Sequence, residues 1–107
     1  MKQPTCEILK WRAVDGTTDE HMRDAMESLA VDVRQLPGFL QQTLYKGPEN
    51  EWICIYYWES AQQAHDSNAA VADKRSFLQL MNIIDANSVS MEVMDAVQHS
   101  GDLHSGG

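Results

Sequence analysis

Residues 39–59 read FLQQTLYKGPENEWICIYYWE, two alternating runs separated by Gly47-Pro48-Glu49-Asn50. Apolar, aromatic and β-branched side chains dominate both runs, and the gap holds the glycine, proline and asparagine typical of turns. This pattern predicts a β-hairpin with strands at 39–46 and 52–59.

The segment before the hairpin contains one more strand pattern and one helix pattern. Residues 6–14 alternate, and apolar residues then recur at three- and four-residue spacing over 19–34. Thr17 and Glu20 have the spacing of a capping box, and Pro37-Gly38 ends the helix before the hairpin.

The segment after the hairpin repeats this alternation of helix and strand. Ser60 is placed to cap a helical region at 61–84, in which Asp73 and its small neighbours mark a kink or a break. Residues 89–96 alternate again and predict a last strand.

The element order is therefore β-α-β-β-α-β, which predicts an α+β, ferredoxin-like protomer. Such a protomer has a four-stranded antiparallel sheet with two helices on one face. With 107 residues, we expect a single domain over 1–97 and a flexible C-terminal tail over 98–107.

The composition disfavours several classes of function. The net charge of −8 repels phosphate backbones, so we expect no nucleic-acid partner. No apolar stretch has the length of a membrane span, and the first residues lack the apolar segment of a signal peptide, so we expect no membrane association and a cytoplasmic location.

No cysteine or histidine lies at metal-ligand spacing from Cys6 or Cys54, so no metal site is predicted. These cysteines fall on neighbouring strands, which allows their sulfurs to approach, and we expect a reduced pair.

The two faces of the sheet differ in character. We expect the aliphatic set of the third strand, Ile53 and Ile55, to meet the helices. Tyr56 and Trp58 would then lie with Tyr45 on the uncovered face, as an aromatic patch too large to leave in water. A two-fold homodimer would cover this patch and close a barrel around a cavity.

Several residues together carry a family resemblance, namely Gly16, Pro37-Gly38, Tyr45 and Trp58-Glu59-Ser60. With this pattern, residues 7–97 resemble the antibiotic biosynthesis monooxygenase family of dimeric α+β barrel proteins. The resemblance implies a ferredoxin-like protomer, a homodimer, and a pocket between sheet and helices or within the barrel. It also implies oxidation of polycyclic aromatic substrates by molecular oxygen without metal or flavin, and therefore no cofactor.

Two departures from the family matter. The family often has a histidine nine residues after the tryptophan of the Trp-Glu-Ser motif, where this chain has Ser67; His65 lies two residues earlier. A haem-degrading branch uses an asparagine on strand one and a tryptophan on helix two, and this chain has neither. Haem degradation is therefore disfavoured.

The candidate catalytic residues are His65 and Tyr56. An imidazole with a pKa near neutrality is a suitable general base for a phenolic proton, although a histidine on a polar helix turn is more often simply solvated. The Tyr56 phenol can donate to a quinone or phenolate oxygen, and an equally consistent role is structural.

The candidate substrate-binding residues are Trp58, Tyr45, Arg12 and Lys10. Trp58 would stack on a flat ligand or pack the strand end against the second helix, and Tyr45 would face the barrel interior. Lys10 and Arg12 would meet an anionic ligand, bridge the dimer, or pair with Glu92 on the last strand. Asn68 falls near the pocket mouth.

The sequence favours a small cofactor-independent monooxygenase-like enzyme that acts on an aromatic or quinol-type metabolite. The alternative is a non-catalytic dimeric protein of the same fold that binds a small molecule. Oxygen uptake separates these two hypotheses.

Overall fold

The computed structural model describes residues 4–101 and contains four strands, three α-helices and one short 3₁₀ helix in that part of the chain. In chain order these are β1 (Thr5–Arg12), α1 (Asp19–Val33), β2 (Phe39–Lys46), β3 (Glu51–Trp58), α2 (Ala61–Val71), α3 (Arg75–Met81), η1 (Ala86–Ser88) and β4 (Ser90–Asp95). The predicted tail lies partly outside the described residues, and the single-domain assignment stays a prediction.

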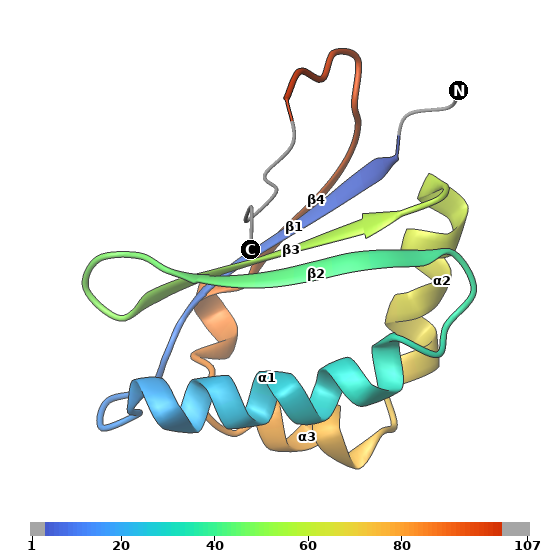
Figure 1. The fold of residues 1–107 in the computed structure, drawn as a ribbon. Coiled ribbons are helices and arrows are strands. Elements are labelled where there is room, and N and C mark those ends of the chain that lie inside the picture. Colours follow the sequence, from blue (N-terminus) through green and yellow to red (C-terminus); the bar gives the residue numbers. More distant parts are fainter. Residues whose placement is uncertain (1–3, 102–107) are drawn as a thin grey trace, which may run out of the picture.

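The four strands form one antiparallel sheet in the order β2-β3-β1-β4. Figure 1 shows α1, α2 and α3 on the same side of this sheet, which leaves its other face bare. The predicted α+β, ferredoxin-like protomer is therefore confirmed. None of the described helices is long and apolar enough to cross a membrane.

The first helix begins at the predicted residue, but its cap is one residue later than predicted. Thr18 is the N-cap, and its Oγ1 accepts a hydrogen bond of 3.0 Å from the His21 N–H. Thr17 instead donates its N–H to the Val14 carbonyl in the turn around Gly16, which has a φ of +87°. The Thr17–Glu20 capping box was therefore wrong, because Thr17 belongs to the turn.

The second helical region is broken where the small residues and Asp73 predicted a kink or a break. Helix α2 ends at Val71, and the backbone is extended again at Lys74 before α3 begins. Ser60 caps α2 as predicted, since its Oγ accepts a hydrogen bond from the Gln63 N–H.

The predicted assignment of the two faces of β3 was wrong. Trp52, Cys54, Tyr56 and Trp58 lie under the helices and are at most 7% exposed. Their partners across the sheet include Glu7, Leu9 and Trp11 of β1, which face the same side. Aromatic side chains bury more area than aliphatic ones, which favours them on the covered face. The indole of Trp58 and the phenol of Tyr56 also form hydrogen bonds in the core. The aromatic set of β3 therefore lies under the helices.

The opposite face of the sheet carries the aliphatic set, and we call it the open face. It is formed by alternate residues of all four strands, namely Cys6, Ile8, Lys10, Arg12, Gln41, Thr43, Tyr45, Ile53, Ile55, Tyr57, Ser90, Glu92 and Met94. Cys6 lies here and Cys54 lies under the helices, so their sulfurs cannot approach one another, and the expectation that they could was wrong. Both thiols are free.

Candidate functional site

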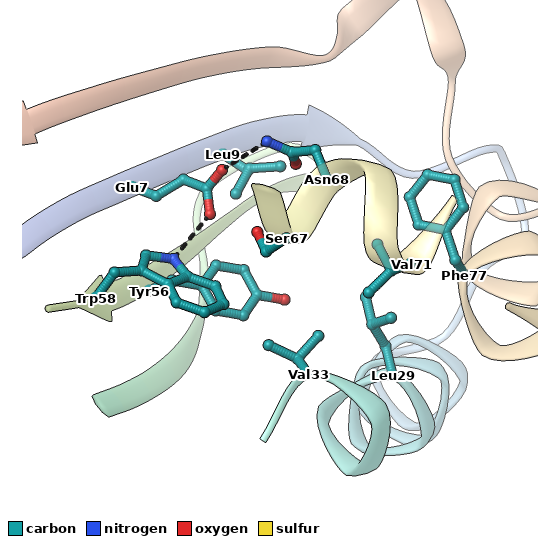
Figure 2. Close-up of a pocket in the computed structure, with 10 residues that line it drawn as sticks. All are labelled: Glu7, Leu9, Leu29, Val33, Tyr56, Trp58, Ser67, Asn68, Val71 and Phe77. Atoms are coloured by element: carbon teal, nitrogen blue, oxygen red, sulfur yellow. Dashed lines mark hydrogen bonds between the residues drawn. The ribbon is translucent and has the colours of Figure 1, made fainter. Parts of the chain in front are cut away.

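A pocket of about 50 Å³ lies between the covered face of the sheet and the three helices (Figure 2). Its wall is mostly apolar, and the polar groups gather at one side. The ten lining residues are Glu7, Leu9, Leu29, Val33, Tyr56, Trp58, Ser67, Asn68, Val71 and Phe77.

Glu7 is the chemically distinctive residue of this pocket. It lies on β1 between Thr5 and Leu9 of the covered face and is only 2% exposed. The Trp58 Nε1–H donates to Oε1 at 3.1 Å, and the Asn68 side-chain amide donates to Oε2 at 3.3 Å (Figure 2). Because a carboxylate has about four acceptor sites, each oxygen can accept one more hydrogen bond from a ligand.

Burial raises the pKa of the Glu7 carboxyl above its ordinary value of 4.5. The hydrogen bonds from Trp58 and Asn68 and the charge of His65 oppose this rise in pKa, but they do not cancel it. A carboxylate with a raised pKa is a stronger base than a solvated one, and none of the ten described lining residues is a cation that would neutralise it.

Two aromatic residues of β3 form the wall beside this carboxylate. The rings of Tyr56 and Trp58 stack with centroids 6.0 Å apart, and Phe39 packs edge-on against Trp58. The Tyr56 hydroxyl donates a hydrogen bond to the Met26 Sδ atom at 3.8 Å. Burial is the first cause that raises the pKa of Tyr56 well above its ordinary value, so this phenol stays protonated and can act as a hydrogen-bond donor.

Helix α2 supplies the other polar groups. Ser67 is buried, and its Oγ donates to the Ala64 carbonyl at 2.6 Å, which leaves its lone pairs free to accept. The Asn68 amide that binds Glu7 also lies 3.4 Å from the same carbonyl. Asn68 in the second half of α2 and Trp58 of β3 together therefore fix the orientation of the Glu7 carboxylate.

The structure brings only part of the predicted site together. Tyr56 and Trp58 line the pocket, but from the helix side of the sheet rather than from a barrel interior. His65 is an exposed residue of α2 and does not belong to the lining, although its charge acts on Glu7.

The remaining predicted residues lie on the open face, away from this pocket. Tyr45 is 45% exposed and pairs with Ile53, and Lys10 and Arg12 are exposed. Among residues 4–101, Lys10 forms no salt bridge with Glu92, which lies across from Ile8 instead.

Glu7 was missed by sequence reasoning. The available signal was the alternation of β1, because Glu7 shares its phase with Leu9 and Trp11 and is therefore an acid on an apolar face. A buried polar residue is more informative than an exposed apolar one.

The volume of the pocket limits what it holds as it stands. An engineered cavity of about 150 Å³ binds benzene, and a buried water needs roughly 10–15 Å³. The present pocket is large enough for a few waters and too small for an aromatic ring. Among the described residues, no group of three or more His, Cys, Asp or Glu side chains is arranged to hold a metal ion.

The fold and this pocket define a ferredoxin-like α+β domain with one buried acid in an apolar site. No protein-family model and no curated protein matches the sequence. Solved structures do match over nearly the whole chain, so the chain has the fold of the antibiotic biosynthesis monooxygenases, as the sequence resemblance implied.

Three of these structures illustrate the match. SnoaB, a cofactor-independent oxygenase from Streptomyces nogalater, is 13% identical with a TM-score of 0.76, covering 94% of this chain and 99% of its own. A candidate antibiotic biosynthesis monooxygenase from Chloroflexus aurantiacus is 19% identical with a TM-score of 0.64, covering 92% of this chain and 97% of its own. Rv0793 from Mycobacterium tuberculosis is 12% identical with a TM-score of 0.70, covering 92% of this chain and 99% of its own. At these identities the likeness defines the fold alone.

Proposed function

We propose that the protein is a cofactor-independent monooxygenase-like enzyme that oxidises a small aromatic or quinol-type metabolite in the pocket around Glu7. The observation that carries this proposal is a buried carboxylate with a raised pKa and spare acceptor sites in an otherwise apolar cavity. The shared fold with the oxygenase SnoaB supports it.

In this proposal Glu7 takes the role of proton acceptor that the sequence suggested for His65. The carboxylate removes a proton from an activated C–H or O–H group of the substrate, while Trp58 and Asn68 hold it in place. The Tyr56 phenol, which donates to the Met26 sulfur in the structure, turns its O–H to the substrate oxygen on which negative charge develops. His65 stays outside the pocket, where its charge favours the ionised form of Glu7.

The reaction balances without an added electron donor. The substrate carbanion gives one electron to dioxygen, and the resulting radical pair combines to form a C–O bond and a peroxide. The proton held by Glu7 returns to the peroxide. Loss of the remaining C–H proton with cleavage of the O–O bond leaves a carbonyl and one water, so a CH₂ group and O₂ become C=O and H₂O. In a phenol or hydroquinone the O–H and one ring C–H supply the two hydrogens, and the product is a quinone and one water.

Oxygen consumption with a panel of anthrones and hydroquinones tests this proposal. We expect uptake by the wild type and a loss of about 10²–10⁴-fold in rate for Glu7→Gln, the usual contribution of a general base. His65→Gln is the matched control and should retain most of the rate. Equal rates for wild type and Glu7→Gln, or no uptake with any compound, would refute the proposed chemistry.

The small pocket favours a second candidate, a non-catalytic protein that binds a small molecule. In that case flat phenols would bind the wild type without any oxygen uptake. A haem titration without a Soret shift would exclude the haem-degrading branch from both candidates.

We also propose that the open face pairs with a second copy of the chain, and that the protein acts in the cytoplasm. The centre of this face is apolar, because Ile8 and Ile55 pair there across β1 and β3, and Ile53 lies further along β3 opposite Lys10. Arg12 at the end of β1 and Glu92 on the edge strand β4 lie toward its margins. A homodimer would cover this centre while the charges pair at the rim.

Sedimentation velocity tests the homodimer with a matched pair of variants. Ile55→Glu should convert the dimer to a monomer, because it places a charge at the apolar centre. Val31→Glu makes the same chemical change on the 48% exposed outer side of α1 and should leave the dimer intact. A monomeric wild type at micromolar concentration would refute the homodimer.

A further inference from the structure

Phe77 is the one residue through which α3 reaches the wall of the pocket (Figure 2). Its ring packs against the core at the side opposite the Glu7 carboxylate, so the two residues define the length of the cavity. The other apolar lining residues come from the sheet, α1 and α2.

Helix α3 is the shortest of the three α-helices that line the pocket. It has only seven residues, it follows the break at 72–74, and Lys74 provides no side-chain cap for it. It packs against α1, where Leu80 is buried and the Ser76 hydroxyl donates to Asp32 Oδ2 at 2.5 Å. Phe77 therefore belongs to a wall element that packs chiefly on α1, so a change of its side chain leaves the pairing of the strands and the cap of α2 in place.

The pocket lacks room for an aromatic ring by about the volume of the Phe77 ring. The pocket of about 50 Å³, which is partly open, is smaller than the engineered cavity of roughly 150 Å³ that binds benzene. Withdrawal of one phenyl ring from the wall adds space for one six-membered ring. The exchange of rings preserves the packing of Leu29, Val33 and Val71, because an aromatic ligand replaces an aromatic side chain.

We propose that Phe77 sets the size of the ligand, and that the pocket takes a single-ring phenol or hydroquinone whose ring replaces that of Phe77 and whose hydroxyl binds Glu7. This inference rests on the proposed function for the pocket as the ligand site, and it narrows the proposed substrate from small aromatic or quinol-type metabolites in general to compounds with a single ring. The Phe77 ring competes with the ligand, so it weakens the binding of every ligand of this size.

Calorimetric titration with phenol and hydroquinone under anaerobic conditions tests this role of Phe77. Phe77→Ala should bind both compounds at least tenfold more tightly than the wild type. Leu80→Ala is the matched control, because it removes a similar buried side chain from the same helix outside the pocket, and it should bind like the wild type. Phe77→Leu should give an intermediate gain and serves as the second variant if Phe77→Ala does not fold.

Three outcomes would overturn the inference. They are equal affinity of wild type and Phe77→Ala, an equal gain in Leu80→Ala, and tighter binding of anthrone than of hydroquinone to the wild type. Adding Glu7→Gln to Phe77→Ala should lower the affinity for phenol, which places the ligand at the carboxylate. Because binding is measured without oxygen, a tighter Phe77→Ala that consumes no oxygen would support the size inference while the proposed oxygenase chemistry fails.

Discussion

Replacement of Glu7 by glutamine tests the physical basis of the pocket independently of any substrate. Glutamine keeps the shape of the side chain and removes its charge. Below a pH of about 4.5 both side chains are neutral. In this pH range we expect the free energies of unfolding of the two proteins to differ by no more than about 1 kcal/mol. This is the net value of one hydrogen bond, because the Asn68 amide must change its hydrogen bond when a glutamine replaces Glu7.

At higher pH the two proteins should diverge in a defined direction. Burial raises the pKa of Glu7 in the folded state, so the folded protein binds this proton more tightly than the unfolded chain does. The stability of the wild type relative to Glu7→Gln therefore falls as the pH rises from about 4.5 through the folded-state pKa. Each unit of the rise in pKa corresponds to about 1.4 kcal/mol. In a domain of this size 1 kcal/mol shifts the melting temperature by roughly 4–8 °C.

Urea unfolding of both proteins between pH 4 and pH 9 measures this difference. All other titrating groups are common to the two chains, so their contributions largely cancel in the comparison. We expect the free energy of unfolding of Glu7→Gln, taken relative to that of the wild type, to be higher at pH 8 than at pH 4.5. A stability difference that is independent of pH, or that moves in favour of the wild type as the pH rises, would refute the account of Glu7 as a desolvated acid.

Three further predictions concern the surroundings of the pocket and the backbone. Trp58→Phe removes the 3.1 Å hydrogen bond to Glu7 and should lower the free energy of unfolding by about 2 kcal/mol at pH 8; a loss below 0.5 kcal/mol would show that the bond contributes little. Burial raises the pKa of Cys54 to about 11, so iodoacetamide at pH 8 should modify the half-exposed Cys6 in the native protein and spare Cys54. Equal labelling of the two cysteines, detected by mass spectrometry, would contradict this prediction. Gly38→Ala should destabilise the protein by about 1–2 kcal/mol in urea, because Gly38 has a φ of +83°, and an unchanged midpoint would refute this strain.

The order of the elements could be predicted because it depends on local patterns. The hairpin turn, for example, is visible as Gly47-Pro48-Glu49-Asn50, and in the structure Glu49 and Asn50 adopt the positive φ that turn residues favour. The break before α3 was visible in the same way, from Asp73 and its small neighbours.

The faces of the sheet could not be predicted from local patterns. Both phases of β3 are apolar, and which one meets the helices depends on their packing with β1 and α1. The error in this assignment moved Tyr56 and Trp58 to the wrong side and paired them with Tyr45, which lies across the sheet from the pocket. Glu7 was missed because an acid in a strand is usually solvated, although the phase that it shares with Leu9 and Trp11 was visible in the sequence.

Glu7 and Ile8 are adjacent in the chain, but because side chains alternate along β1 they lie on opposite faces of the sheet. Selection for a new ligand acts on the odd-numbered positions of this strand, whereas selection on the bare side of the sheet acts on the even-numbered ones. The two properties can then change separately over evolutionary time, and a single inserted residue in β1 would exchange both at once.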